Sequence, residues 1–228
     1  MDTEPLHKEK LMAVATGHGI CLTEEDWPTL HGIGDKRAWE WLRQSRGLAI
    51  SQEQFLSECE EYYMAHPEMI VPRTGAQDVF NYFASLSLPQ CAVSSGIKTQ
   101  VDTNLAISGV GDRMLFALSA DEVKKTKPDP EPYLIGKSRL CERLGWEETA
   151  MEGAHFLAIE DSVPGVVSAK RAGMTTILWA QTPGKSCPEA DYVAYTSADL
   201  LRICGEITAK SYSSHEPAPK NKSPPKPD

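Results

Sequence analysis

Short apolar runs that alternate with helical patterns are the feature that most constrains this chain. From about residue 71 onward, each run is long enough for one strand, and apolar residues at helical spacing separate it from the next. Short strands that are apolar throughout and joined by helices form parallel sheets with both faces covered. We therefore predict an α/β fold, in which ligands bind at the carboxyl ends of the strands. The runs occupy residues 91–93, 115–118, 156–159, 175–179 and 192–195.

The segment before residue 71 has a different pattern, which predicts a helical bundle. Ser51 begins a sequence with capping-box spacing, and apolar residues at helical spacing follow it. A Gly-Ile-Gly turn at 32–34 separates two helical stretches. We expect a helical domain over residues 1–70, an α/β core over 71–210, and a disordered tail over 211–228, where proline and lysine replace apolar residues.

Charge and composition argue against several classes of function. The 228 residues carry a formal net charge of −9 at pH 7, which repels a phosphate backbone, so we expect no nucleic-acid partner. No apolar stretch approaches the length of a membrane span and no signal peptide is visible, so we expect no membrane attachment. The six cysteines form no CxxC pair, which is typical of reduced thiols. We expect a cytoplasmic protein that acts as a monomer.

Glu160 and Asp161 follow directly after the apolar run at 156–159. Two adjacent carboxylates at the end of a buried strand repel each other and are costly to desolvate, and a cation would offset both costs. Oxygen ligands of this kind suit Mg²⁺, which one or two carboxylates bind together with phosphate and water. The alternative is a solvated turn before a helix, because acidic side chains also stabilise helix N-termini.

Two other segments place polar groups at predicted strand ends. Lys127 lies in Lys-Pro-Asp-Pro, where two prolines fix an extended loop, and a lysine held at such a cleft can stabilise phosphoryl charge. Ser95 follows the run at 91–93, where its hydroxyl and nearby backbone N–H groups can bind a phosphate oxygen. Each segment has a simpler alternative, which is a solvated turn for Lys127 and a helix cap for Ser95.

The order of these three segments resembles motifs II, III and IV of haloacid dehalogenase-like enzymes, and the match is nearest to their β-phosphoglucomutase-like branch. The sequence Ile-Glu-Asp-Ser-Val-Pro-Gly at 159–165 is similar to the fourth motif. The sequence Asp-Thr-Glu-Pro-Leu-His at 2–7 is similar to the segment that leads from the first motif into a helical cap. The resemblance implies a Rossmann-like parallel-sheet core with an inserted helical-bundle cap, Mg²⁺ as the cofactor and an aspartyl-phosphate intermediate.

The resemblance also implies a role for each matching residue. Lys127 would stabilise the charge of the transferring phosphoryl group, and His7 would assist proton transfer or position the substrate. Glu160 and Asp161 would hold Mg²⁺, directly or through water. The residues expected to bind phosphate or to select the substrate are Ser95, Lys98, Lys36 and Arg37.

The chain departs from the family pattern at the first motif, Asp-x-Asp-Gly, which carries the nucleophilic aspartate and ends the first core strand. The matching stretch would precede Met1, and no other Asp-x-Asp-Gly sequence replaces it. We expect an upstream coding segment that supplies both the strand and the motif, because loss of a central strand leaves buried backbone groups unpaired. The predicted function is a Mg²⁺-dependent phosphatase of a small phosphorylated metabolite. The alternatives are a sugar-phosphate mutase and an inactive binding module.

Overall fold

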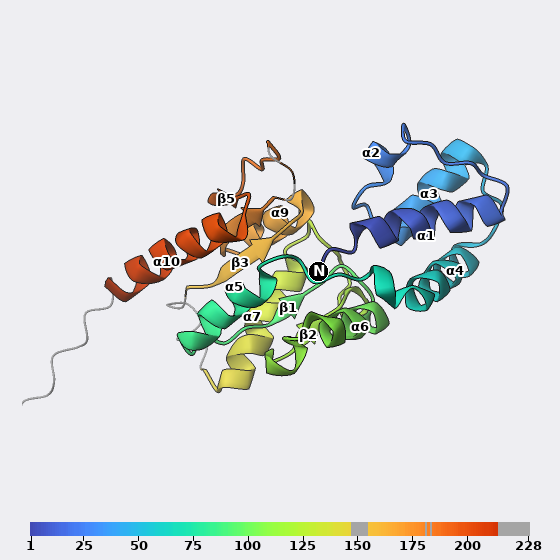
Figure 1. Cartoon of the computed structure of the whole chain (residues 1–228). Coiled ribbons are helices and arrows are strands. Elements are labelled where there is room, and N and C mark those ends of the chain that lie inside the picture. Colours follow the sequence, from blue (N-terminus) through green and yellow to red (C-terminus); the bar gives the residue numbers. More distant parts are fainter. Residues whose placement is uncertain (147–154, 181, 183, 214–228) are drawn as a thin grey trace, which may run out of the picture.

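The computed structural model describes residues 1–146, 155–180, 182 and 184–213, and its N-terminal part is helical (Figure 1). This part, which we call the helical bundle, consists of α1 (Glu4–Gly17), α2 (Trp27–Leu30), α3 (Asp35–Arg46) and α4 (Gln52–Ala65). Helix α4 packs against both α1 and α3. The prediction that the segment before residue 71 is helical is confirmed.

Local sequence signals explain where the bundle helices begin. Ser51 caps α4, because its hydroxyl accepts a hydrogen bond from the Gln54 N–H at 3.2 Å. Gly32 and Gly34 have φ values of +71° and +76°, so the turn between α2 and α3 uses a backbone conformation that favours glycine. The buried face of the bundle includes Leu11, Val14, Leu30, Leu42, Phe55 and Cys59.

Parallel strands follow the bundle, but they form two sheets. The strands are β1 (Ala92–Val93), β2 (Ala117–Leu118), β3 (Leu157–Glu160), β4 (Thr175–Trp179) and β5 (Tyr192–Ala194). Strand β1 pairs with β2, and β4 lies between β3 and β5 in the second sheet. These strands coincide with the apolar runs of the sequence, so the predicted parallel α/β fold is confirmed. We expected one sheet, whereas no backbone pairing within the described residues joins β1 to β3.

Helices cover both faces of the second sheet, as predicted. The helices of this part are α5 (Ala76–Ser85), α6 (Lys98–Ser108), α7 (Glu131–Leu144), α9 (Val163–Arg171) and α10 (Ser197–Ser213), with short 3-10 turns η1 (Pro67–Met69), η2 (Gly111–Arg113) and η3 (Ala120–Glu122). Side chains alternate along β4, so that Ile177 and Trp179 pack with α5 and α10, whereas Leu178 packs with α9. Helix α7 contacts α9 and β1.

The C-terminal boundary differs slightly from the prediction. Helix α10 extends to Ser213 and so includes the first three residues of the expected tail, and the remaining tail residues, 214–228, lie outside the described residues. Within the part of the chain that the structure describes, no helix combines the length and the apolar character needed to cross a bilayer.

Candidate active site

The carboxyl ends of β1 and β3 meet at one buried lysine. The Lys127 ammonium donates a hydrogen bond to the backbone oxygen of Val93 at 2.9 Å and another to Oε1 of Glu160. The side chains of Lys127 and Glu160 are only 7% and 8% exposed. A single cation therefore links two strand ends that share no backbone pairing, and the structure brings together two of the predicted site residues.

The Glu160 carboxylate has further partners that fix its orientation. The Tyr133 hydroxyl, on α7, also donates to Oε1, and the Ser162 hydroxyl lies 3.4 Å from Oε2. Burial, and then the negative charge of Glu160, raises the pKa of the Tyr133 phenol well above its usual value. The phenol therefore stays protonated at neutral pH and remains a hydrogen-bond donor to the carboxylate.

Gly165, in the first turn of α9, leaves the space that the Glu160 carboxylate occupies. A Cβ atom at Gly165 would overlap both carboxylate oxygens of Glu160. The helix is held in this position by Ser162, whose hydroxyl accepts a hydrogen bond from the Gly165 N–H at 3.1 Å. The close approach of the carboxylate is thus the reason for glycine here.

A Gly165→Ala variant is expected to lose roughly 10²-fold in kcat/KM, because displacement of a reacting-site group by about 1 Å can have an effect of that size. Gly205→Ala, on α10, is the matched control, since the added methyl would lie 3.8 Å from the Tyr82 hydroxyl in ordinary contact. Steady-state kinetics and thermal unfolding of both variants test the prediction. Unchanged kinetics in Gly165→Ala would show that the position of Glu160 does not matter for turnover.

Asp161 differs from Glu160 in that its side chain is exposed. Lys185 donates to the Asp161 backbone oxygen at 2.8 Å. The charge of Asp161 acts on the start of α1: burial raises the pKa of Glu4, Asp161 adds to the rise, and His31 opposes it. Oε1 of Glu4 is buried without a hydrogen-bond partner, although His31 Nδ1 lies 3.4 Å away. Asp161 and Glu4 are therefore close enough for their charges to interact.

The donor set at the end of β3 fits Mg²⁺. Asp161 offers an exposed carboxylate, and Oε2 of Glu160 is not used by Lys127 or Tyr133. Among the described residues, no group of three or more His, Cys, Asp or Glu side chains is placed to hold a metal ion. Mg²⁺ does not require such a group, because it usually keeps water and phosphate oxygens beside one or two carboxylates.

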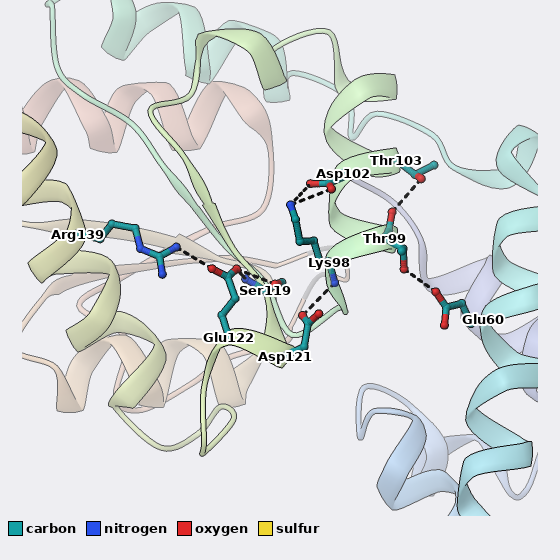
Figure 2. Close-up of polar contacts among 9 residues, drawn as sticks. All are labelled: Glu60, Lys98, Thr99, Asp102, Thr103, Ser119, Asp121, Glu122 and Arg139. Carbon is teal, nitrogen blue, oxygen red and sulfur yellow. Dashed lines mark hydrogen bonds and ion pairs between the residues drawn. The ribbon is translucent and has the colours of Figure 1, made fainter.

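Ser95 and Lys98 lie after β1, at the start of α6. The Ser95 side chain is exposed in the loop. The Lys98 ammonium pairs with Asp102 at 2.9 Å, and the Lys98 backbone N–H donates to Asp121 at 3.0 Å (Figure 2). Because Asp102 already offsets part of the Lys98 charge on the exposed surface of α6, the phosphate contact of Lys98 stays a prediction.

The remaining predicted residues belong to the helical bundle. Lys36 and Arg37 are exposed in the first turn of α3. His7 lies on α1, with its ring centroid 5.3 Å from that of Tyr63. None of the hydrogen bonds and ion pairs recorded for the described residues links these three side chains to Lys127, so their roles stay predictions.

The stability of the protein is expected to fall below pH 6.5 because of His7. Burial, and then the positive charge of Lys10, lowers the pKa of His7 from 6.5 to about 4. Between these values the unfolded chain binds more protons than the folded chain, so stability is lost as the pH falls. From pH 7 to pH 5 the loss amounts to about 2 kcal/mol.

Urea unfolding at pH 7 and pH 5 measures this loss. The His7→Gln variant should lose about 2 kcal/mol less than the original chain over the same interval, because glutamine does not titrate. An equal loss in both proteins would contradict the prediction.

Sequence reasoning missed Tyr133 and Arg73. Tyr133 lies on α7, which begins directly after the Lys-Pro-Asp-Pro sequence. Its closeness in sequence to Lys127 could have indicated that it belongs to the site. The Arg73 guanidinium lies 4.0 Å from the ring centroid of Trp179. Burial lowers the pKa of Arg73, whereas Asp161 opposes the change. No local pattern marks Arg73, because its neighbours come from distant strands.

Comparisons with known proteins agree with the fold described above. The model of a family described as haloacid dehalogenase-like hydrolase matches residues 1–179. "Phosphorylated carbohydrates phosphatase" of Thermotoga maritima is 27% identical over 215 residues, which span 91% of this chain and 94% of the relative. The structure of β-phosphoglucomutase from Clostridium difficile has a TM-score of 0.73 at 18% identity and 94% coverage of both chains. A family IA hydrolase from Entamoeba histolytica has a TM-score of 0.71 at 20% identity, covering 90% of this chain and 93% of the other.

Proposed function

Because this chain belongs to the haloacid dehalogenase-like hydrolase family, we propose that it is a Mg²⁺-dependent phosphatase of a small phosphorylated metabolite. The observation that carries the proposal is the buried Lys127–Glu160 pair at the carboxyl ends of β1 and β3, with Asp161 beside it. Ligands of open α/β sheets bind at that edge. The relative that is named for phosphorylated carbohydrates supports a small phosphorylated molecule as the substrate.

In this proposal the strand-end residues act on the phosphoryl group. The Lys127 ammonium has three donors, of which Val93 and Glu160 accept two, so the third is left for a phosphoryl oxygen. The Ser95 hydroxyl would donate to another phosphoryl oxygen. Mg²⁺ held by Asp161 and Glu160 would supply further positive charge to the phosphoryl oxygens.

An alternative to the phosphatase is a module that binds phosphorylated ligands without turnover, because the strand-end donors would hold a phosphoryl group whether or not it is transferred. A sugar-phosphate mutase, the other alternative, would use the same phosphate site and release an isomerised product instead of free phosphate.

Two measurements on the full chain distinguish these functions. Phosphate release from a panel of sugar monophosphates, abolished by a chelator and restored by Mg²⁺, is the expected result. Calorimetric titration with inorganic phosphate in the presence of Mg²⁺ reports binding independently of turnover. Binding without release or isomerisation would replace the phosphatase by the binding module, and an isomerised product would support the mutase. The absence of phosphate release, of an isomerised product and of phosphate binding would reject the proposed site.

A further inference from the structure

One face of α1 meets the turn between α2 and α3. Glu4, His7 and Lys10 follow each other at intervals of three residues on this helix. Oε1 of Glu4 lies 3.4 Å from Nδ1 of His31, which precedes the turn. Nζ of Lys10 lies 2.7 and 2.8 Å from the two carboxylate oxygens of Asp35, which follows the turn. The turn is therefore attached to α1 on both sides of His7.

Lys10 is unusual because a charged side chain is fully buried, with 0% exposure. All three of its N–H donors have partners, since two reach Asp35 and the third lies 3.1 Å from Nδ1 of His7. Lys10, His7, Asp35 and Tyr63 form one cluster. The ring of Tyr63, on α4, packs beside Lys10, with its centroid 5.8 Å from the Lys10 nitrogen. A buried ion pair contributes little net stability compared with an apolar replacement, so stability alone does not account for this cluster.

We propose that Lys10 is a positioning residue that fixes the His7 imidazole in one tautomer. An ammonium group donates and cannot accept, so Nδ1 of His7 must be the acceptor in their contact. The single proton of the neutral imidazole then resides on Nε2. Asp35 anchors the ammonium, so the turn that carries Asp35 determines which nitrogen of His7 can donate.

The surroundings of His7 favour the neutral ring. The charged and titratable groups that face it are Lys10 on α1, Asp35 on α3 and Tyr63 on α4. Burial and the Lys10 charge lower the pKa of His7 to about 4, and Asp35 only partly opposes them. At neutral pH the ring therefore has one donor, Nε2–H, and no second proton to give.

The cluster also connects the helical bundle to the α/β part. The Tyr63 hydroxyl donates to Oδ1 of Asn104, on α6, at 2.8 Å. The start of α1 lies beside the α/β part (Figure 1). The next step rests on the proposed function: the Nε2–H of His7 donates to an oxygen of the phosphorylated substrate. With Nδ1 occupied by Lys10, His7 does not act as a general base at neutral pH.

Nitrogen-15 NMR of the full chain, labelled at histidine, tests the tautomer directly and needs no turnover. The His7→Gln variant identifies the His7 signals among those of the six histidines. The expected result is an unprotonated Nδ1 and a protonated Nε2 at pH 7, with no titration of His7 down to about pH 5. A proton on Nδ1, or titration of His7 near pH 6.5, would overturn the inference.

Lys10→Met should raise the titration midpoint of His7 toward 6.5 and allow both tautomers. Lys8→Met is the matched control, because Lys8 lies on the same helix and pairs with Glu24 at 2.6 Å. If Lys10→Met does not fold, the spectrum of the original chain still tests which nitrogen of His7 carries the proton. If the tautomer is as expected but no phosphate is released, the inference on Lys10 stands and the proposed function fails.

Discussion

A Lys127→Met variant is expected to lose roughly 10²–10³-fold in kcat, because removal of one donor aimed at developing charge has an effect of this size. The same change leaves the Glu160 carboxylate buried at 8% exposure without its cation. Breaking a buried pair by removing one partner typically destabilises a protein by about 3–5 kcal/mol. Kinetics and urea unfolding of the same preparation measure the two effects.

Two further variants separate catalysis from folding. Lys127→Met combined with Glu160→Gln removes both charges, so it should recover part of the lost stability while activity stays low. Lys125→Met is the matched control, because Lys125 lies in the same loop with its side chain 71% exposed. Full activity in Lys127→Met would show that the buried lysine serves the fold alone.

Replacement of both metal-site carboxylates, Glu160→Gln with Asp161→Asn, is expected to abolish Mg²⁺-dependent turnover, with a loss of at least roughly 10³-fold. The reason is that a metal ion contributes several kcal/mol of charge stabilisation in the transition state, and about 1.4 kcal/mol corresponds to tenfold in rate. The measurement is phosphate release as a function of Mg²⁺ concentration.

The single variants should behave differently from each other. Asp161 is exposed, so Asp161→Asn should weaken Mg²⁺ binding and leave unfolding nearly unchanged. Glu160→Gln should also destabilise the fold, since it leaves Lys127 unpaired. Asp112→Asn, at an exposed position in η2, serves as the control for loss of one surface charge. Unchanged Mg²⁺ dependence with both carboxylates replaced would remove the metal assignment.

Much of the fold was predictable because its signals are local. Apolar runs such as 175–179 became strands, and the Ser51 cap and the glycine turn at 32–34 set helix boundaries. Strand pairing was predicted less well, because whether β1 and β3 share a sheet depends on contacts between distant segments. Capping and periodicity act over a few residues, so they carry no information on such pairing.

The sequence by itself determined the family resemblance, the α/β pattern, and Lys127, Glu160 and Asp161 as candidates for one strand-end site. Only the tertiary structure decided that Lys127 is buried against Glu160 across a separation of 33 residues. It alone also placed Lys10 against Asp35, 25 residues apart, and in contact with His7. The physical reason is that burial and ion pairing depend on which segments the whole chain packs together, whereas a motif records only the residue types that the chemistry needs.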